Sequence, residues 1–232
     1  MQLLYTTAML LTAAAFLSAQ EPAGTPSPRP EKPTALPADI YPDALARLPL
    51  VKREEMDELG KKMYDRLVSG QARSLVGLQG PYGIWLHSPQ LAERVEPLVY
   101  YLRYETELGR RLTELAILVS ARELDSQFEW TAHEPAALKE GLEPAVIDVV
   151  RHRKSAAGLG EKEALIITFG RELFQKRKVS SATFARARKV FGDRGVVELA
   201  ALMGEYSSVS ALINAFDIQL NPDQKPLLPM QE

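Results

Sequence analysis

The chain has 232 residues, of which 46% are hydrophobic, and 28 basic against 30 acidic side chains give it a net charge of −2. Because the two signs are interspersed, the charge pattern does not indicate a nucleic-acid partner. The sequence contains no cysteine, which excludes disulfides and thiolate nucleophiles, so any chemistry must use carboxylate, imidazole or hydroxyl groups.

The first twenty residues carry no charged side chain, and an apolar stretch over 8–17 is followed by Ser18, Ala19 and Gln20. This pattern is typical of a signal peptide spanning 1–20. We therefore expect a secreted or periplasmic protein with no membrane association after cleavage. An uncleaved membrane anchor is the alternative, but the apolar stretch is shorter than the ~20 residues that a membrane span needs.

Residues 21–49 are rich in proline, which disfavours both helix and sheet and predicts a disordered arm outside the fold. Helical periodicity dominates 50–220, and no strand pattern is convincing, so the sequence predicts a single all-α domain of about seven helices. The tail, 221–232, is expected to be coil. The helices are expected at 53–69, 88–105, 110–125, 126–141, 144–153, 162–178, 180–191 and 195–217, with a loop at 71–88. The last helix is apolar nearly all round, which predicts that it is buried.

One segment carries most of the potential chemistry. Ser126, Glu129 and His133 stand at i, i+3 and i+7, so they share one face of a continuous helix, and Glu114 lies on the helix before it. A purely structural interpretation also explains part of this pattern, because Ser-x-x-Glu at a helix start is a capping box. Pro135 is expected to kink this helix close to His133.

Each of these side chains has a structural alternative to a functional role. His133 is compatible with a core or ion-pair histidine beside Trp130. Glu114 stands in an apolar helix and needs a partner, because burial disfavours its charged form. Arginines near it in sequence supply that partner in the structural interpretation: Arg110, Arg111 and Arg122. Tyr206 in the last helix and His87 in the glycine-rich loop are further candidates for a pocket wall.

Other catalytic classes lack their residues. The chain has no Gly-x-Ser-x-Gly elbow, no His-Glu-x-x-His motif, no P-loop and no dinucleotide glycine fingerprint. The three histidines are too scattered to indicate zinc. We therefore expect neither a metal nor a cofactor.

The run 112–123, the sequence Phe128-Glu129-Trp130 with His133 three residues later, and the downstream order through Gly204-Glu205-Tyr206 resemble the carboxymuconolactone decarboxylase family. That family shares its fold with the alkylhydroperoxidase D proteins, and the resemblance covers about 51–220. It implies an all-α domain that assembles into homo-trimers or homo-hexamers.

In the alkylhydroperoxidase branch of that fold, a Glu and a His flank a Cys-x-x-Cys pair. By spacing, Glu114 and His133 match this Glu and His, while Ser126 and Glu129 occupy the cysteine positions. A hydroxyl and a carboxylate cannot cycle through sulfenic acid and disulfide. Thiol peroxidase activity is therefore excluded.

The decarboxylase branch suits these residues better, and it implies a small unsaturated lactone or keto carboxylic acid as substrate. We expect His133 to act as acid and base, with Glu114 or Glu129 orienting it. The helix N-terminus at Ser126 is expected to hold a substrate carboxylate. Pocket walls are expected from Trp130, Tyr206 and His87. The competing interpretation is a non-catalytic small-molecule-binding or structural helical oligomer on the same scaffold.

Overall fold

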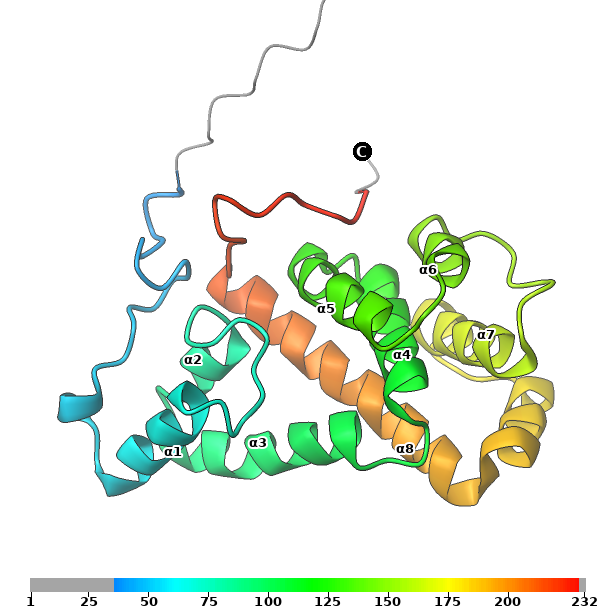
Figure 1. The fold of residues 1–232 in the computed structure, drawn as a ribbon, viewed down its shortest axis with the longest axis horizontal. Helices are drawn as coiled ribbons and strands as arrows, with labels where there is room; N and C mark the ends of the chain where they lie inside the picture. The colour runs from blue at the N-terminus through cyan, green and yellow to red at the C-terminus, as the bar shows by residue number, and fades with distance from the viewer. Residues whose placement is uncertain (1–35, 230–232) are drawn as a thin grey trace, which may run out of the picture. The chain divides into compact units, whose positions relative to one another are not determined.

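The computed structural model describes residues 36–229, so the expected signal peptide, 1–20, and the first part of the arm, 21–35, lie outside the described range. Within that range the fold is all-α and no strand is present (Figure 1). The elements are η1 (Arg53–Glu55), α1 (Glu58–Val68), α2 (Pro81–Trp85), α3 (Pro89–Tyr104), α4 (Arg110–Glu123), α5 (Gln127–Lys139), α6 (Pro144–Arg151), α7 (Glu161–Lys176) and α8 (Ser181–Phe216).

Local sequence signals explain most helix boundaries. Asp57 caps α1 by accepting a hydrogen bond from the backbone N–H of Gly60 at 2.7 Å. Prolines begin α3 and α6, where their missing N–H costs nothing. Gly141, with φ +84°, follows α5 in a conformation that other residues rarely adopt. The loop expected at 71–88 is partly wrong, because it contains the short helix α2.

Helix α4 is the centre of the domain and packs against α5, α7 and α8 (Figure 1). Five successive residues in it, 115–119, are fully buried, so it has no solvent-facing side over this stretch. It approaches α7 closely at Gly170, where an added Cβ would lie 2.4 Å from Cγ1 of Val119. This close packing fixes the position of the polar groups that α4 carries.

Helix α8 runs across the domain as one element of 36 residues. It bends at Gly192, whose φ of +70° and ψ of 175° are not helical, and this is where the sequence predicted a break between two helices. Its inner face carries buried residues such as Leu199, Leu202 and Tyr206, whereas Val197 is 68% exposed. The helix is therefore buried on one face rather than all round. Its length and composition would suit a membrane span, but half of its most apolar window is buried in the domain, as in the core helix of a soluble protein.

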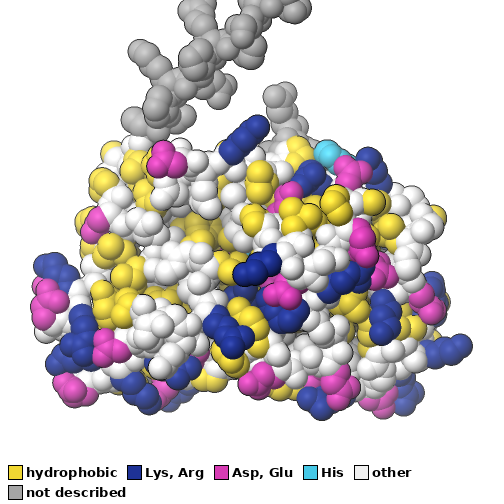
Figure 2. Space-filling view, in the orientation of Figure 1, with side chains coloured by type: hydrophobic (Ala, Val, Ile, Leu, Met, Phe, Trp, Pro, Cys, Tyr) yellow, Lys and Arg dark blue, Asp and Glu magenta, His cyan; other side chains and the backbone are white. Residues whose placement is uncertain are grey.

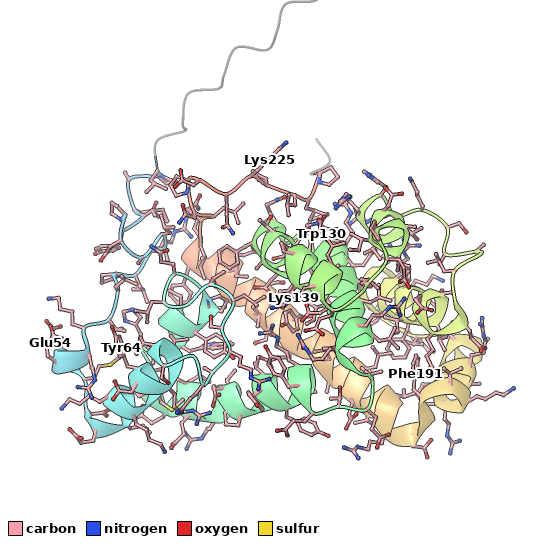
Figure 3. The ribbon with its side chains drawn as sticks, viewed as in Figure 1. Glu54, Tyr64, Trp130, Lys139, Phe191 and Lys225 are labelled. Carbon is pink, nitrogen blue, oxygen red and sulfur yellow. The ribbon has the colours of Figure 1, made fainter. Side chains whose placement is uncertain are left out.

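Helix α5 includes Pro135 and runs from Gln127 to Lys139 as one element, so it does not end and restart beside His133. The proline removes one backbone donor but leaves the helix from Gln127 to Lys139 intact. Figure 3 labels Trp130, in the first part of this helix, and Lys139, its last residue.

The domain extends beyond 50–220 at both ends. The N–H of Arg47 donates to the carbonyl of Phe216 at 2.9 Å, and the N–H of Gln219 donates to the carbonyl of Leu45 at 2.8 Å. Residues 36–49 therefore pack against the end of α8 instead of forming a separate arm. Residues 221–229 contain no helix, yet Leu228 is only 3% exposed and belongs to the core.

Basic and acidic side chains are interspersed over the face seen in Figure 2, with hydrophobic side chains between them. Several large apolar side chains on α3, α5 and α8 are about half exposed or more: Leu91, Leu98, Leu138, Phe184 and Val197.

Candidate active site

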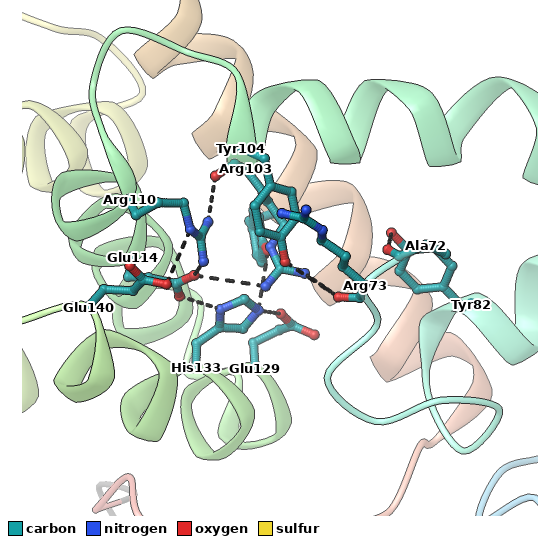
Figure 4. Close-up of polar contacts among 11 residues, drawn as sticks. Ala72, Arg73, Tyr82, Arg103, Tyr104, Arg110, Glu114, Glu129, His133 and Glu140 are labelled. Carbon is teal, nitrogen blue, oxygen red and sulfur yellow. Dashed lines mark hydrogen bonds and ion pairs between the residues drawn. The ribbon is translucent and has the colours of Figure 1, made fainter. Parts of the chain in front are cut away.

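The contact between α4 and α5 brings Glu114 and His133 together (Figure 4). Oε2 of Glu114 lies 2.7 Å from Nδ1 of His133, and both side chains are buried. A carboxylate at this distance selects the tautomer in which Nδ1 carries the proton, and it orients the ring. The pairing expected from the sequence is therefore present as a direct hydrogen bond.

The other oxygen of Glu114 faces two arginines. Nη2 of Arg110 donates to Oε1 at 2.7 Å, and Nη2 of Arg103 lies 3.8 Å from the same oxygen. The ion pair with Arg110, which the structural interpretation of Glu114 expects, is therefore present. The carboxylate is fully buried and is charge-compensated from both sides.

Burial alone raises the pKa of Glu114, but attraction to His133 and its hydrogen bond, together with the two arginines, hold the pKa well below its ordinary value of 4.5. Burial alone lowers the pKa of His133, but the charge and hydrogen bond of Glu114, with a further hydrogen bond to Glu129, raise this pKa above 6.5. The pair therefore favours an imidazolium next to a carboxylate near neutral pH.

Two groups meet the second ring nitrogen of His133. Oη of Tyr206 lies 3.2 Å from Nε2, and Oε2 of Glu129 lies 3.4 Å from it. Burial raises the pKa of Tyr206 well above 10, so its hydroxyl stays protonated. His133 is thus held at Nδ1 by one carboxylate, while Nε2 meets a neutral hydroxyl and a second carboxylate.

A cavity of about 40 Å³ lies on the Nε2 side of the imidazole. It is lined by His133, Glu129, Tyr206, Arg103 and Tyr82, and by Ser74, Leu75 and Val76 from the segment 69–80, which we term the cover loop. This volume matches the share of one or two water molecules. It is far below the roughly 300–1,000 Å³ of typical ligand pockets, so this conformation has no room for a ligand of that size.

Sequence reasoning missed Arg103, a guanidinium that is only 4% exposed and lines this cavity. Its Nη1 donates to the carbonyl of Arg73 at 3.5 Å, a long contact, and its Nε and Nη2 have no hydrogen-bond partner within the described residues. The only signal in the sequence is its place between apolar and aromatic residues in Tyr101-Leu102-Arg103-Tyr104. Such a charge is costly to bury without a partner.

Two of the residues expected to form pocket walls do not reach the cavity. Trp130 is fully buried in the main core, where its Nε1 donates to Glu134. His87 is exposed and contacts the carbonyl of Pro49 at 3.0 Å. Both positions correct the expectation that these residues form pocket walls.

Ser126 precedes α5 as expected but does not form the capping box. Its side chain accepts no hydrogen bond from the helix start, and its buried Oγ has no partner in the described part of the chain. Ser126 is also not among the residues that line the cavity. Glu129 turns to His133 instead of the helix N-terminus, because the imidazole lies one turn further along the same face.

Residues 36–229 contain no group of three or more His, Asp or Glu side chains arranged to hold a metal ion. Of the two Glu side chains near His133, Glu129 at the cavity contacts its Nε2, and Glu114 pairs with its Nδ1 and with Arg110. The arrangement is suited to proton transfer by an imidazole with a fixed orientation.

Comparisons with known proteins agree with this geometry. Residues 89–168, which include α4, α5 and all three of Arg103, Glu114 and His133, match the family model of the Carboxymuconolactone decarboxylase family. The fold is similar to a crystal structure described as an alkylhydroperoxidase AhpD core, an uncharacterized peroxidase-related protein from Ralstonia eutropha JMP134. The TM-score is 0.63 and the identity 15%, over 76% of this chain and 93% of that one. No curated protein matches the sequence. Residues 89–168 thus match the Carboxymuconolactone decarboxylase family, and the chain has an all-α fold that is similar to the alkylhydroperoxidase AhpD core but contains no cysteine.

Proposed function

We propose that this protein is a cofactor-free lyase that decarboxylates a small unsaturated lactone or keto carboxylic acid, with His133 as the general acid. The observation that carries the proposal is a row of three contacting side chains, Glu114, His133 and Tyr206. Glu114 holds the imidazole of His133 at Nδ1, and Nε2 meets Tyr206 at the cavity. Absence of cysteine excludes the thiol peroxidase chemistry of the wider fold.

In the proposed reaction, the bond between the carboxylate carbon and its neighbour breaks and carbon dioxide leaves. The electron pair of that bond delocalises into the unsaturated system of the substrate as an anion. His133 then donates its Nε2 proton to a carbon atom of this delocalised anion, and solvent returns a proton to the imidazole. General acid catalysis of this kind contributes roughly 10²–10⁴-fold.

The surroundings of His133 support this role. Glu114 keeps the imidazole protonated near neutral pH, since it raises the pKa of His133. Its charge is in turn balanced by Arg110 and Arg103. Glu129, 3.4 Å from Nε2, is close enough to hold the acidic proton until the substrate arrives. The second carboxylate is thus a proton-holding group, not a nucleophile.

Because the cavity is too small for a substrate, we infer that the cover loop moves when a substrate enters. Three of the hydrogen bonds that attach this loop are long: from Tyr82 to the carbonyl of Ala72 at 3.4 Å, and from Tyr104 and Arg103 to the carbonyl of Arg73 at 3.4 and 3.5 Å. Hydrogen bonds of this length are weak. Gln79 holds the loop more firmly, by a hydrogen bond of 3.0 Å to the carbonyl of Asp43. We infer that the part of the loop around Arg73 opens to admit the acid and closes over it.

The test is turnover. Purified protein is incubated with a panel of unsaturated lactone acids and keto acids, and release of carbon dioxide is measured. We expect one member of the panel to be turned over, and we expect His133→Gln to abolish that turnover while the fold is retained. Turnover that is unchanged in His133→Gln contradicts the assignment. A panel that is bound but not turned over favours the non-catalytic binding protein instead.

We also propose that the protein is exported and forms a trimer or hexamer. The apolar, uncharged N-terminal twenty residues support export. The half-exposed apolar side chains on α3, α5 and α8 support assembly. Mass measurement of the exported protein and light scattering test both proposals; an uncleaved N-terminus or a monomeric mass would contradict them.

A further inference from the structure

We propose that Arg103 is the receptor for a carboxylate of the substrate, so that the ligand of this site is a small organic anion. The assignment rests on the proposed function for its biological use and deepens it, because it names the group by which the substrate is held. It begins from the two guanidinium nitrogens, Nε and Nη2, that are buried without a hydrogen-bond partner in the described residues.

Burying an arginine in this way is expensive. A guanidinium has five N–H donors, and buried polar groups in folded proteins are almost always hydrogen-bonded. The nearest carboxylate, Glu114, is 3.8 Å away and is already engaged at shorter distance by Arg110 and His133. Arg103 therefore lines the cavity with a positive charge and with N–H donors on Nε and Nη2 that no described residue accepts.

The shape of these donors suits one class of ligand. A guanidinium presents its nitrogens in a planar fork that matches the two oxygens of a carboxylate. The cavity that Arg103 lines also contains Nε2 of His133, the proposed acid. A carboxylate on Arg103 would thus place the remainder of a small acid beside His133.

The carboxylate on Arg103 is a group that remains in the product. Catalysis requires interactions that are stronger in the transition state than in the ground state. An ion pair with the departing carboxylate would stabilise the ground state and oppose its loss as neutral carbon dioxide. We therefore assign to Arg103 an acid group that survives the reaction, and we expect simple monocarboxylates to occupy the subsite.

Arg103 also links the subsite to the cover loop. Its Nη1 contacts the carbonyl of Arg73 (Figure 4). The guanidinium of Arg73 lies over the rings of Tyr100 and Tyr104. A carboxylate that orders Arg103 would strengthen this attachment. Bound anion and closed loop should therefore favour each other.

The experiment measures binding, not turnover. Acetate and propionate are titrated into the isotopically labelled full-length protein, and backbone amide shifts are followed by NMR. Acetamide and propionamide serve as neutral isosteres, and sodium chloride serves as the ionic-strength control. We expect saturable shifts in the cover loop and around His133 with the acids, and none with the amides or chloride.

The matched variants are Arg103→Met, Arg103→Lys and Arg111→Met. Arg111 is on α4, whereas Arg103 is on α3, and Arg111 pairs with Glu143 and Glu163 away from the cavity. We expect Arg103→Met to weaken acetate binding by at least about tenfold, in line with the loss of a charged hydrogen bond. Arg103→Lys, which keeps the charge but not the fork, should bind acetate less tightly than the wild type, and Arg111→Met should bind it equally well.

The failure of this assignment is distinguishable from failure of the proposed function. No saturable binding of acetate to the wild type, or wild-type affinity in a folded Arg103 variant, overturns the carboxylate subsite. Acetate binding that depends on Arg103, in a protein that turns over none of the lactone and keto acids, leaves the subsite standing and overturns only the lyase. If Arg103→Met does not fold, the acetate affinities of Arg103→Lys and Arg111→Met decide. A weaker affinity in Arg103→Lys supports the subsite, and equal affinities overturn it.

Discussion

Oε2 of Glu114 and Nδ1 of His133 lie 2.7 Å apart although the two residues are separated by 19 positions and belong to different helices. This hydrogen bond is buried, so it is shielded from solvent and salt. It orients the imidazole, sets its tautomer and raises its pKa. The expected behaviour of the site follows largely from this one contact.

Replacement of Glu114 by Gln should destabilise the protein by about 3–5 kcal/mol, because it leaves the buried Arg103 and His133 without their counter-charge. Denaturant unfolding at pH 7 measures this loss. The control is Glu143→Gln: its side chain is 57% exposed and pairs with Arg111, so we expect about 0–1 kcal/mol. Equal losses in the two variants would show that the Glu114 cluster contributes nothing beyond a surface ion pair.

The stability of the protein should depend on pH through the same pair. The pKa of His133 is raised in the folded state, so its contribution is complete below pH 6.5 and is lost as the pH rises through the raised value. The pKa of Glu114 is depressed, so its contribution is present above pH 4.5 and is lost as the pH falls through the folded value. We expect the pair to stabilise the fold most between about pH 4.5 and 6.5.

Denaturant unfolding across pH 3 to 9 checks this, with His133→Gln as the matched variant. The difference in unfolding free energy between the wild type and His133→Gln should shrink as the pH rises above 6.5. A difference that grows with pH would mean that His133 is buried in its neutral form.

Trp130→Phe and Tyr206→Phe should separate core from site. Trp130 is fully buried and bonded to Glu134 away from the cavity, so its truncation should lower stability by about 1–3 kcal/mol and leave the titration of His133 unchanged. Tyr206→Phe removes the hydroxyl 3.2 Å from Nε2 and should shift the titration of His133. NMR titration of His133 in the two variants measures both effects on its pKa. A His133 pKa that shifts in Trp130→Phe but not in Tyr206→Phe contradicts the placement of Trp130 in the core and of Tyr206 at the site.

Gly170→Ala and Gly204→Ala test the packing that holds α4 in place. At Gly170 an added Cβ would meet Cγ1 of Val119 at 2.4 Å, so we expect a loss of about 1–3 kcal/mol from overpacking. At Gly204, on the exposed face of α8, nothing lies within 4 Å, so alanine should stabilise the helix by about 0.5–1 kcal/mol. Thermal unfolding of both variants gives the comparison, and equal signs at the two positions would contradict it.

Helix positions could be predicted because their signals are local. Proline at the first turn of α3 and α6, glycine after α1 and α5, and periodic apolar residues between them depend only on neighbours in sequence. The same reasoning failed for residues 36–49 and 228. Their burial depends on contacts with α8 and the main core that no local pattern reveals.

The candidate site was predictable only in part. Glu114 and His133 are unusual in their helices, so the sequence could single them out and determined which acid–base chemistry is available. It could not show that Glu129 leaves the capping position for His133, or that Trp130 and His87 point elsewhere.

The sequence by itself determined that the chemistry is not thiol-based, because it contains no cysteine. It also determined that the fold is helical, because the spacing of its apolar residues has a helical period. Tertiary structure decided which charged groups face one cavity. Arg103, Glu114, His133 and Tyr206 come from four helices, and their distances follow from how α3, α4, α5 and α8 pack around a common core. Packing of that kind depends on contacts between distant segments, so the buried, under-bonded Arg103 became visible only in the folded chain.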